Sequence, residues 1–487
     1  MRNSTRRLVL LFLTFVILSA PAIQAMEVNE DHQDMEGPFP DGPSVTAACL
    51  ECHEDVAHDF MKTSHWNWAP MQMVGEEQAP LGKKNIINNF CIAVSSNWPR
   101  CTSCHPGYGW TNSEFDFTDP GNIDCLVCHD KTGTYRKFPT GAGHPPYKPK
   151  EWKGKIWEPV DLAGIARSVG MPARENCGVC HFNGGGGNNV KHGDMEKALL
   201  KPALELDVHM SPDGQDFTCQ ECHTTENHNI SGNAIFVSPS GQNHLECTSC
   251  HEDQVHDKKI LDWHAKSVAC QTCHIPTFAR ANPTKTWWDW STAGTKLQQE
   301  KDEFGMPTFV NKKGTFKWEK NVVPAYAWFN GVAGQYLLGD QMNPDQETSL
   351  NWPQGNRVDP KAMITPFKLM KATQPYDIKS RTLVVPQLFG KTGFWKTFDW
   401  KSSITNGQNS LGMEFSGEYG FAPTVAWWKI NHMVAPADQA LKCKACHPTA
   451  GNGRMDWSAL GYDGDPMHKR GLSRYEMKEK YRGMELN

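Results

Sequence analysis

The pattern Cys-x-x-Cys-His occurs eight times in this chain, and each copy brings two thiols and an imidazole together. Two cysteines three residues apart can each form a thioether to one edge of the same porphyrin, and the adjacent histidine can reach its iron. The pattern therefore predicts eight covalently attached haem c groups. The copies are Cys49-Cys52-His53, Cys101-Cys104-His105, Cys125-Cys128-His129, Cys177-Cys180-His181, Cys219-Cys222-His223, Cys247-Cys250-His251, Cys270-Cys273-His274 and Cys443-Cys446-His447.

Zinc sites and disulfide frameworks also use closely spaced cysteines. Zinc gives no reason for a histidine after every pair. A disulfide framework has no reason to repeat one short spacing eight times. We therefore favour haem over both alternatives.

Each haem iron has two axial positions, and the motif histidine ordinarily takes one of them. The chain has 20 histidines, so twelve remain beyond the motifs. The predicted distal ligands are His65, His144, His192, His209, His228, His256, His264 and His432. His58 and His244 are weaker candidates, and His32 and His468, near the chain ends, are the weakest. Most haems can thus be bis-histidine, which suits electron transfer, and the count alone requires no open haem.

Cys91 is the one cysteine of the 17 outside the motifs. An unpaired thiol in an oxidising compartment is a liability unless it is buried or used. A buried, inert thiol is one interpretation. The other is a sulfur beside an open iron, where it could exchange with a sulfur-containing substrate.

Charge and hydropathy restrict the class of protein. A formal net charge of −5 and a pI near 6.5 argue against nucleic acid as a partner. Hydrophobic residues make up 39% of the chain and the mean hydropathy is −0.57, which is lean for a core of this length. We expect a mainly α fold with extensive irregular structure, a multihaem cytochrome c fold wrapped around a stack of eight haems.

Residues 1–25 have the form of a signal peptide. Arg2, Arg6 and Arg7 precede an apolar run, and small residues follow it. This predicts export to the bacterial periplasm and cleavage of the signal. No later segment is apolar over the about 18 residues that a membrane span needs, so we expect no stable membrane insertion.

The spacing of the motifs divides the mature chain. We predict a seven-haem core at 26–280, a haem-free Trp-rich region at 281–430, and the eighth haem with a C-terminal tail at 431–487. The middle region contains ten of the 18 tryptophans, and its frequent Pro and Gly predict irregular structure with short hairpins. The glycine run at 184–187 is expected to lie close to a haem plane.

Several segments resemble one known family, the octahaem tetrathionate reductase cytochromes, over most of the mature chain. They are the stretch around Cys91, Cys101-Thr-Ser-Cys104-His105-Pro-Gly-Tyr-Gly-Trp110, Gly141-Ala-Gly-His144-Pro, Lys191-His192-Gly-Asp194, Leu206-Asp-Val-His209-Met, Cys270-Gln-Thr-Cys273-His274-Ile-Pro276 and Phe329-Asn-Gly331.

This resemblance implies that the second haem is unusual, with a lysine ligand on its iron and an open face toward a substrate cleft. Cys91 looks like the family cysteine beside that cleft. Lys155 and Lys191 are the two candidates for the lysine, with Lys148, Lys150 and Lys153 as alternatives. A lysine ligand must be neutral, which requires burial or a nearby metal charge. Pentahaem nitrite reductases carry such a lysine inside the motif, whereas all eight motifs here end in histidine.

The leading hypothesis is a periplasmic reductase of tetrathionate, nitrite or hydroxylamine. Its partners would be a small inorganic anion as substrate and a redox protein or quinol-linked cytochrome as electron donor, and a homo-oligomer is possible. A conduit with all haems bis-histidine is the main alternative. A hydroxylamine-oxidising enzyme is the other.

Overall fold

The computed structural model describes residues 32–252, 254–451 and 453–469. The predicted signal peptide and most of the predicted C-terminal tail lie outside these residues. Within the described residues, no helix is both long enough and apolar enough to cross a membrane.

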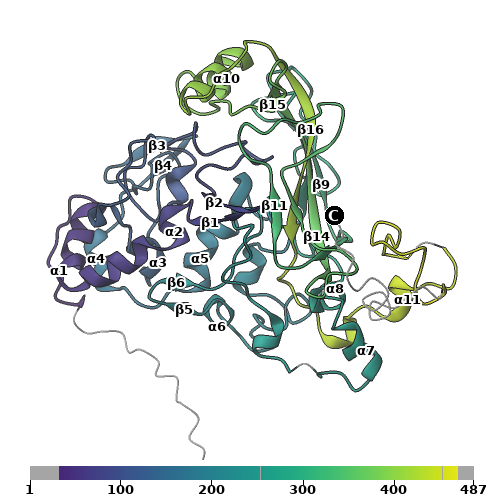
Figure 1. The fold of residues 1–487 in the computed structure, drawn as a ribbon. Coiled ribbons are helices and arrows are strands. Elements are labelled where there is room, and N and C mark those ends of the chain that lie inside the picture. Colours follow the sequence, from purple (N-terminus) through teal and green to yellow (C-terminus); the bar gives the residue numbers. More distant parts are fainter. Residues whose placement is uncertain (1–31, 253, 452, 470–487) are drawn as a thin grey trace, which may run out of the picture.

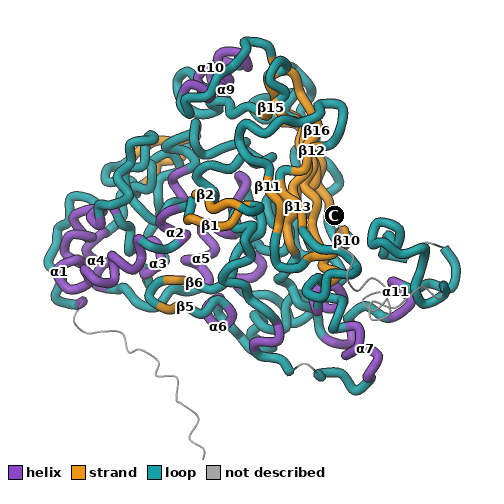
Figure 2. The backbone as a smooth tube through the Cα atoms, viewed as in Figure 1, coloured by secondary structure: helices purple, strands orange, loops and turns teal. Residues whose placement is uncertain are grey.

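Short helices and long loops make up the part of the chain that carries the first seven motifs, and loops dominate it (Figures 1 and 2). The longest helix, α1, spans Gly42–Met61 and begins at Asp41, whose side chain accepts from the backbone N–H of Ser44. The other helices are α2 (Ser64–Asn67), α3 (Leu126–His129), α4 (Leu162–Arg167), α5 (Arg174–His181), α6 (Cys219–Cys222), α7 (Lys259–His264), α8 (Cys270–His274), α9 (Phe394–Thr397), α10 (Trp400–Asn409) and α11 (Cys443–Cys446). The 3-10 turns are η2 (Thr102–Cys104), η3 (Pro120–Asn122), η4 (Gly184–Gly186), η5 (Lys197–Leu200), η6 (Cys247–Ser249) and η7 (Ala437–Gln439).

Each of the eight motifs includes a helical turn. The first lies inside α1, where His53 leaves helical geometry (φ −118°, ψ 29°). The second and sixth overlap η2 and η6, and the others overlap α3, α5, α6, α8 and α11. Residues i and i+3 share one face of a helical turn, so this local structure points both cysteines of a motif in one direction.

The region after the seventh motif contains an eight-stranded sheet, seen at the right of Figure 1. Its path runs β12-β16-β14-β7-β9-β8, with β10 and β15 also pairing with β14. These strands are β7 (Thr284–Asp289), β8 (Phe309–Val310), β9 (Gly314–Glu319), β10 (Ala325–Phe329), β12 (Thr348–Ser349), β14 (Met363–Asp377), β15 (Thr382–Leu383) and β16 (Tyr419–Lys429). Two-stranded ribbons are formed by β1 (Met71–Val74) with β2 (Glu77–Pro80), β3 (Lys150–Trp152) with β4 (Lys155–Trp157), β5 (Thr225–Glu226) with β6 (Asn229–Ile230), and β11 (Ala333–Gln335) with β13 (Asn351–Pro353).

This sheet differs from the irregular structure and short hairpins expected for residues 281–430. The 15-residue β14 pairs antiparallel with β16 from Phe367↔Lys429 to Asp377↔Tyr419. Prolines had argued against long strands because they lack a backbone N–H. Here their carbonyls still accept, Pro366 from Ile430 and Pro375 from Val384, so the strand continues through them.

The sheet also has a conventional side-chain core, although a lean core was expected. Trp288, Trp290 and Met370 are fully buried in its largest apolar cluster. The segment 86–97, which precedes the second motif, joins this cluster through Ile86, Phe90 and other apolar residues. The sheet is therefore one wall against which the stretch around Cys91 is held.

Candidate functional site

One connected cavity of about 3790 Å³ runs through the motif-bearing part of the protein, several times the size of an ordinary ligand pocket of about 300–1,000 Å³. Cysteines of the second to eighth motifs line it. Its wall includes large apolar side chains with no protein cover, such as Trp263 (58% exposed) and Ile260 (56%). Thiols and uncovered apolar walls fit porphyrin faces attached through thioethers.

Seven motif histidines each face one histidine from elsewhere in the chain. Their ring centroids are 6.0 to 6.3 Å apart in every pair. In motif order the pairs are His53 with His32, His129 with His228, His181 with His65, His223 with His432, His251 with His209, His274 with His256, and His447 with His264.

The constant separation is informative because the ring planes meet at angles from 16° to 76°. Direct ring packing favours particular orientations. Two ligands of one metal keep their separation whatever the rotation about each metal–nitrogen bond. Bonds of about 2 Å to both imidazoles would place the ring centroids roughly 6 Å apart. These seven pairs are therefore our predicted axial pairs.

The hydrogen bonds of six of these rings involve Nδ1 and leave Nε2 free to bind a metal. His129, His223 and His264 bond through Nδ1 to the carbonyls of Gly170 (3.0 Å), Ser231 (2.8 Å) and Ile260 (2.7 Å). His256, His432 and His447 bond through Nδ1 to aspartates. A partner on one ring nitrogen fixes the tautomer and leaves the other nitrogen for a metal.

His105, in the second motif, shows the reverse arrangement. Its Nε2 lies 2.7 Å from the backbone oxygen of Trp66, and its buried Nδ1 has no hydrogen-bond partner among the described residues. The ring is fully buried among the rings of Trp66, Trp68 and Trp110, with centroids 4.9 to 5.3 Å away. It is absent from the cavity wall, although Cys101 and Cys104 of the same motif line it.

His105 was also expected to ligate iron, but in this geometry its Nε2 bonds a carbonyl and tryptophan rings surround it. It also leaves two predicted distal ligands without a motif partner. His144 stacks on Tyr108 (5.2 Å) and bonds the Tyr147 hydroxyl, and His192 packs edge-on against Trp428 (5.1 Å). His32, ranked among the weakest candidates, lies 6.0 Å from His53. The chain order of histidines could not reveal which rings meet in space.

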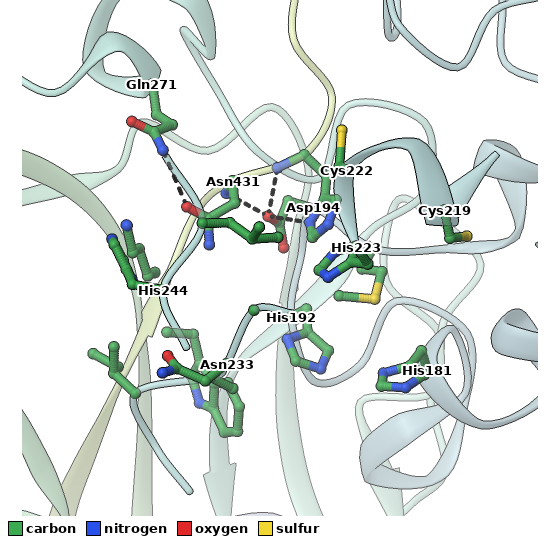
Figure 3. A pocket seen from close by; sticks show the side chains of 18 of the residues that line it. His181, His192, Asp194, Cys219, Cys222, His223, Asn233, His244, Gln271 and Asn431 are labelled. Carbon is green, nitrogen blue, oxygen red and sulfur yellow. Dashed lines mark hydrogen bonds and ion pairs between the residues drawn. The ribbon is translucent and has the colours of Figure 1, made fainter. Parts of the chain in front are cut away.

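Figure 3 shows the part of the cavity where His181, His192 and His223 lie around one space. His192 is half-buried there, and burial, followed by the neighbouring Lys191, lowers its pKa well below the usual range. It is therefore a neutral imidazole on the cavity wall.

Contacts between cysteines of different motifs give the order of the motifs in space. Four thiol pairs are close enough to shift each other's pKa strongly: Cys49 with Cys125, Cys104 with Cys180, Cys177 with Cys219, and Cys247 with Cys270. Three more are close enough to interact electrostatically: Cys128 with Cys177, Cys222 with Cys250, and Cys273 with Cys446. These sulfurs become thioethers on haem attachment. The contacts therefore show only which motifs are neighbours in space.

Those contacts connect all eight motifs. The path runs first, third, fourth, fifth, sixth, seventh, eighth, and the second motif meets only the fourth. The carbonyl of Cys104 also lies 3.8 Å from the Sγ of Cys180. The second motif is thus a side branch of a relay, and the fourth is the junction.

Cys91 is held at the cavity wall beside the second motif by a tight loop. The side chain of Asn88 accepts from the N–H groups of Phe90 and Cys91, and Asn88 N–H donates to the Ile92 carbonyl (2.6 Å). Ile92 takes a left-handed φ of 67°, rare for a β-branched residue. Its side chain is fully buried, whereas Cys91 lines the cavity. Such conformations persist where the surroundings impose them, often at functional sites.

The structure separates the two candidate lysines. Lys191 lines the cavity, and burial, followed by nearby Lys83, lowers its pKa to about 7. Lys155, on β4, is exposed and is not on the cavity wall. Lys153, in the turn before β4, and Lys148, ahead of β3, are also exposed and away from that wall. The sequence could not distinguish Lys155 from Lys191, because the difference in their burial arises only from tertiary packing. Glycine run 184–187 follows the same wall, where a Cβ on Gly184 would lie 3.0 Å from the Lys191 side chain.

Cations gather around the second motif. Lys83 and Arg100 line the cavity beside Lys191, and the Lys83 ammonium lies 3.8 Å from the Trp68 ring centroid. Within the described part of the chain, no carboxylate forms an ion pair with any of these three. Sequence reasoning did not single out Lys83 or Arg100. Positive side chains without acidic partners, facing a cavity, favour binding of an anion there.

Two further buried lysines lie behind this wall. Lys368 on β14 is fully buried and donates to the carbonyls of Val190 (2.9 Å) and Lys191 (3.0 Å) and to the Thr284 hydroxyl (2.6 Å). Lys285 on β7 is also buried, with its ammonium 3.2 Å from the Phe316 ring centroid. Lys368 therefore ties the backbone of Lys191 to the sheet.

The motif turns, the imidazole pairs and the lined cavity together define a multihaem c-type cytochrome. A bacterial cytochrome c family model matches residues 285–450. An uncharacterized protein of Archaeoglobus fulgidus is 26% identical over 226 residues, which cover 38% of this chain and 75% of that protein.

A solved octahaem cytochrome c from Shewanella oneidensis is 49% identical to this chain. Its structure superposes with a TM-score of 0.84 and covers 91% of this chain and 99% of that one. The chain therefore belongs to the octahaem c-type cytochromes. Haem c is bound covalently, and the number of eight follows from that relative and from the eight motifs.

Proposed function

We propose that this cytochrome is a periplasmic multi-electron reductase of a small inorganic oxidant, with its active site at the second motif. The observation that supports this most directly is the orientation of His105, which bonds Trp66 and leaves the cavity side of the second motif to Lys191, Lys83, Arg100 and Cys91. Haem bound there would supply electrons and an iron able to bind the oxidant.

Lys191 is the side chain best placed to act as the axial ligand of this site. It is on the cavity wall, close enough to Cys104 for the two to interact. Burial keeps much of its amine neutral near pH 7, which a metal ligand requires. Lys83 and Arg100 would bind an anionic substrate.

Cys91 makes tetrathionate the substrate with the most specific chemistry. A Cys91 thiolate could attack the central S–S bond, releasing one thiosulfate and holding the other in a mixed disulfide. Two electrons from the relay would then release the second thiosulfate and regenerate the thiolate. Nitrite and hydroxylamine need no such sulfur, so they would use only the iron and the cationic wall.

The remaining seven motifs suit electron transfer from a redox protein or a quinol-linked cytochrome. Their paired imidazoles would fill both axial positions and exclude substrate. The conduit hypothesis describes these seven sites well, but His105 gives the second motif no such pair.

The test is steady-state reduction of tetrathionate, nitrite and hydroxylamine by the holoprotein and by Cys91→Ser, with reduced viologen as donor. We expect loss confined to tetrathionate. Ser410→Ala, which removes the hydroxyl of an exposed residue at the end of α10, is the control. Equal rates with all three substrates would make Cys91 structural. Failure of cyanide, nitrite and hydroxylamine to alter about one eighth of the haem spectrum would refute an open site.

A further inference from the structure

Three of the seven paired sites have an axial imidazole bonded to a carboxylate. His432, opposite the fifth motif, lies 3.2 Å from Asp194. His256, opposite the seventh, lies 2.9 Å from Asp262, and His447 of the eighth motif lies 2.5 Å from Asp465. The hydrogen bond thus shortens along the relay toward the eighth motif.

The other ring partners are neutral. Backbone carbonyls accept from His129 at the third motif and from His223 and His264 at the fifth and eighth. In the described part of the chain, no hydrogen bond is made by the ring nitrogens of His32 or His53 at the first motif. The two ends of the relay therefore differ in the charge that faces their ligands.

A carboxylate bonded to Nδ1 makes an imidazole a stronger electron donor to the metal that its Nε2 binds. Stronger donation favours the oxidised metal and lowers its reduction potential, and hydrogen bonding around the ligands is one of the protein's means of setting that potential. Hydrogen bonds to charged groups are about twice as strong as neutral ones. The lowering of the reduction potential should be largest at Asp465, which makes the shorter hydrogen bond, and smaller at Asp262.

Asp194 should have the weakest effect of the three. Its Oδ2 also accepts from the backbone N–H groups of Asn431 (2.8 Å) and His432 (3.0 Å), which share its negative charge (Figure 3). Asp465 Oδ1 accepts one other N–H, from Met467 (2.9 Å). The expected potentials rise from the eighth motif through the seventh to the fifth.

From this gradient we propose that electrons enter the protein at the eighth motif, with Asp465 and Asp262 holding that end of the relay at the lowest potentials. Cys443 and its neighbours Lys442 and Lys444 are exposed, so a donor can approach this motif. The direction of flow rests on the proposed reduction at the second motif, which lies five steps away through the seventh, sixth, fifth and fourth motifs.

The test is a redox titration of the holoprotein, followed by haem absorbance and electron paramagnetic resonance. Asp465→Asn keeps the size and an oxygen acceptor but removes the charge. We expect the lowest-potential fraction, about one eighth of the haem, to move upward, with a smaller upward shift in Asp262→Asn. Asp438→Asn, an exposed carboxylate close to the eighth motif in sequence with no hydrogen bond to a histidine ring, is the matched control.

The upward shift in Asp465→Asn should clearly exceed that in Asp438→Asn, because of these two carboxylates Asp465 is the one bonded to a histidine ring. Equal shifts in both variants, or an unchanged lowest-potential fraction, would overturn the proposal. The proposed function is judged separately, because reduction of tetrathionate by the fully pre-reduced protein should be the same in wild type and Asp465→Asn.

Discussion

The protonation state of Lys191 links burial to the chemistry proposed for the second motif. Burial lowers its pKa to about 7, far below the ordinary value of a lysine. Only the neutral amine can bind a metal, so binding would lower that pKa further. His105, by contrast, needs no metal to account for its Nε2, which bonds the Trp66 carbonyl. The Lys191 amine therefore faces the cavity, whereas the His105 imidazole does not.

This difference predicts a pH-dependent spectrum. Because metal binding lowers the pKa of the amine below about 7, protonation of Lys191 should displace it from iron only at more acidic pH and change the absorption of roughly one eighth of the haem. Above this pH the amine is neutral and the spectrum should be constant. Lys191→Met should lack the transition, whereas Lys155→Met should keep it because Lys155 is exposed away from the cavity. A transition that survives in Lys191→Met would assign it to another group.

Strand β14 positions the wall of the proposed active site. Lys368 crosses from this strand to the loop that carries Val190 and Lys191, and its three hydrogen bonds join two parts of the chain far apart in sequence. The loop around Cys91 is bound to the same strand, since Asn89 donates to the Met370 carbonyl (2.5 Å) and Gln374 donates to the Asn88 carbonyl (2.9 Å). One strand therefore sets the relative positions of the thiol and the amine.

Lys368→Met should weaken this connection. Methionine fills similar volume but leaves the carbonyls of Val190 and Lys191 without this donor, at a cost on the order of 2 kcal/mol in the free energy of unfolding. The pH transition of Lys191 should also broaden or shift, which a purely structural role elsewhere would not cause. Lys371→Met is the control, because its ion pair with Glu347 is half-exposed on the same strand and should contribute at most about 1 kcal/mol. Denaturant unfolding and pH titration of both variants measure the two effects.

The relay has one junction at the scale of the whole molecule. Every route from the fifth to eighth motifs to the second passes through the fourth, where His181 faces His65. The third and first motifs lie on another branch. Substrate reduction should therefore depend unequally on sites that look alike in sequence.

Changing the junction should slow the enzyme more than changing the side branch. Methionine ligation raises the potential of a haem, and about 59 mV changes a one-electron equilibrium tenfold. His65→Met should therefore trap electrons at the fourth motif and lower turnover at least about tenfold when electrons come from a protein donor. His228→Met makes the same change at the third motif and should leave turnover within about twofold. Comparable losses in the two variants would contradict the inferred route.

The haem-binding cysteines could be identified from the sequence because their chemistry is local. A motif of five residues contains both thioether positions within one helical turn, so no tertiary contact is needed to recognise it. The family could be recognised for a similar reason, from short segments around several motifs. The long strands β14 and β16 were not predicted because prolines, such as those at 366, 375 and 423, are typical of loops. Only the pairing across the sheet shows that these strands tolerate them.

The cofactor, the number of attachment motifs and the position of Cys91 outside them follow from the order of residues alone. Tertiary structure decided which imidazoles face each other, because partners such as His223 and His432 are 209 residues apart. It also decided that the His105 ring packs among tryptophan rings and that Lys191, rather than the exposed Lys155, lies half-buried on the cavity wall. The type of a side chain limits the bonds it can form, but its solvation and its neighbours select among them, and both arise only when distant segments pack together.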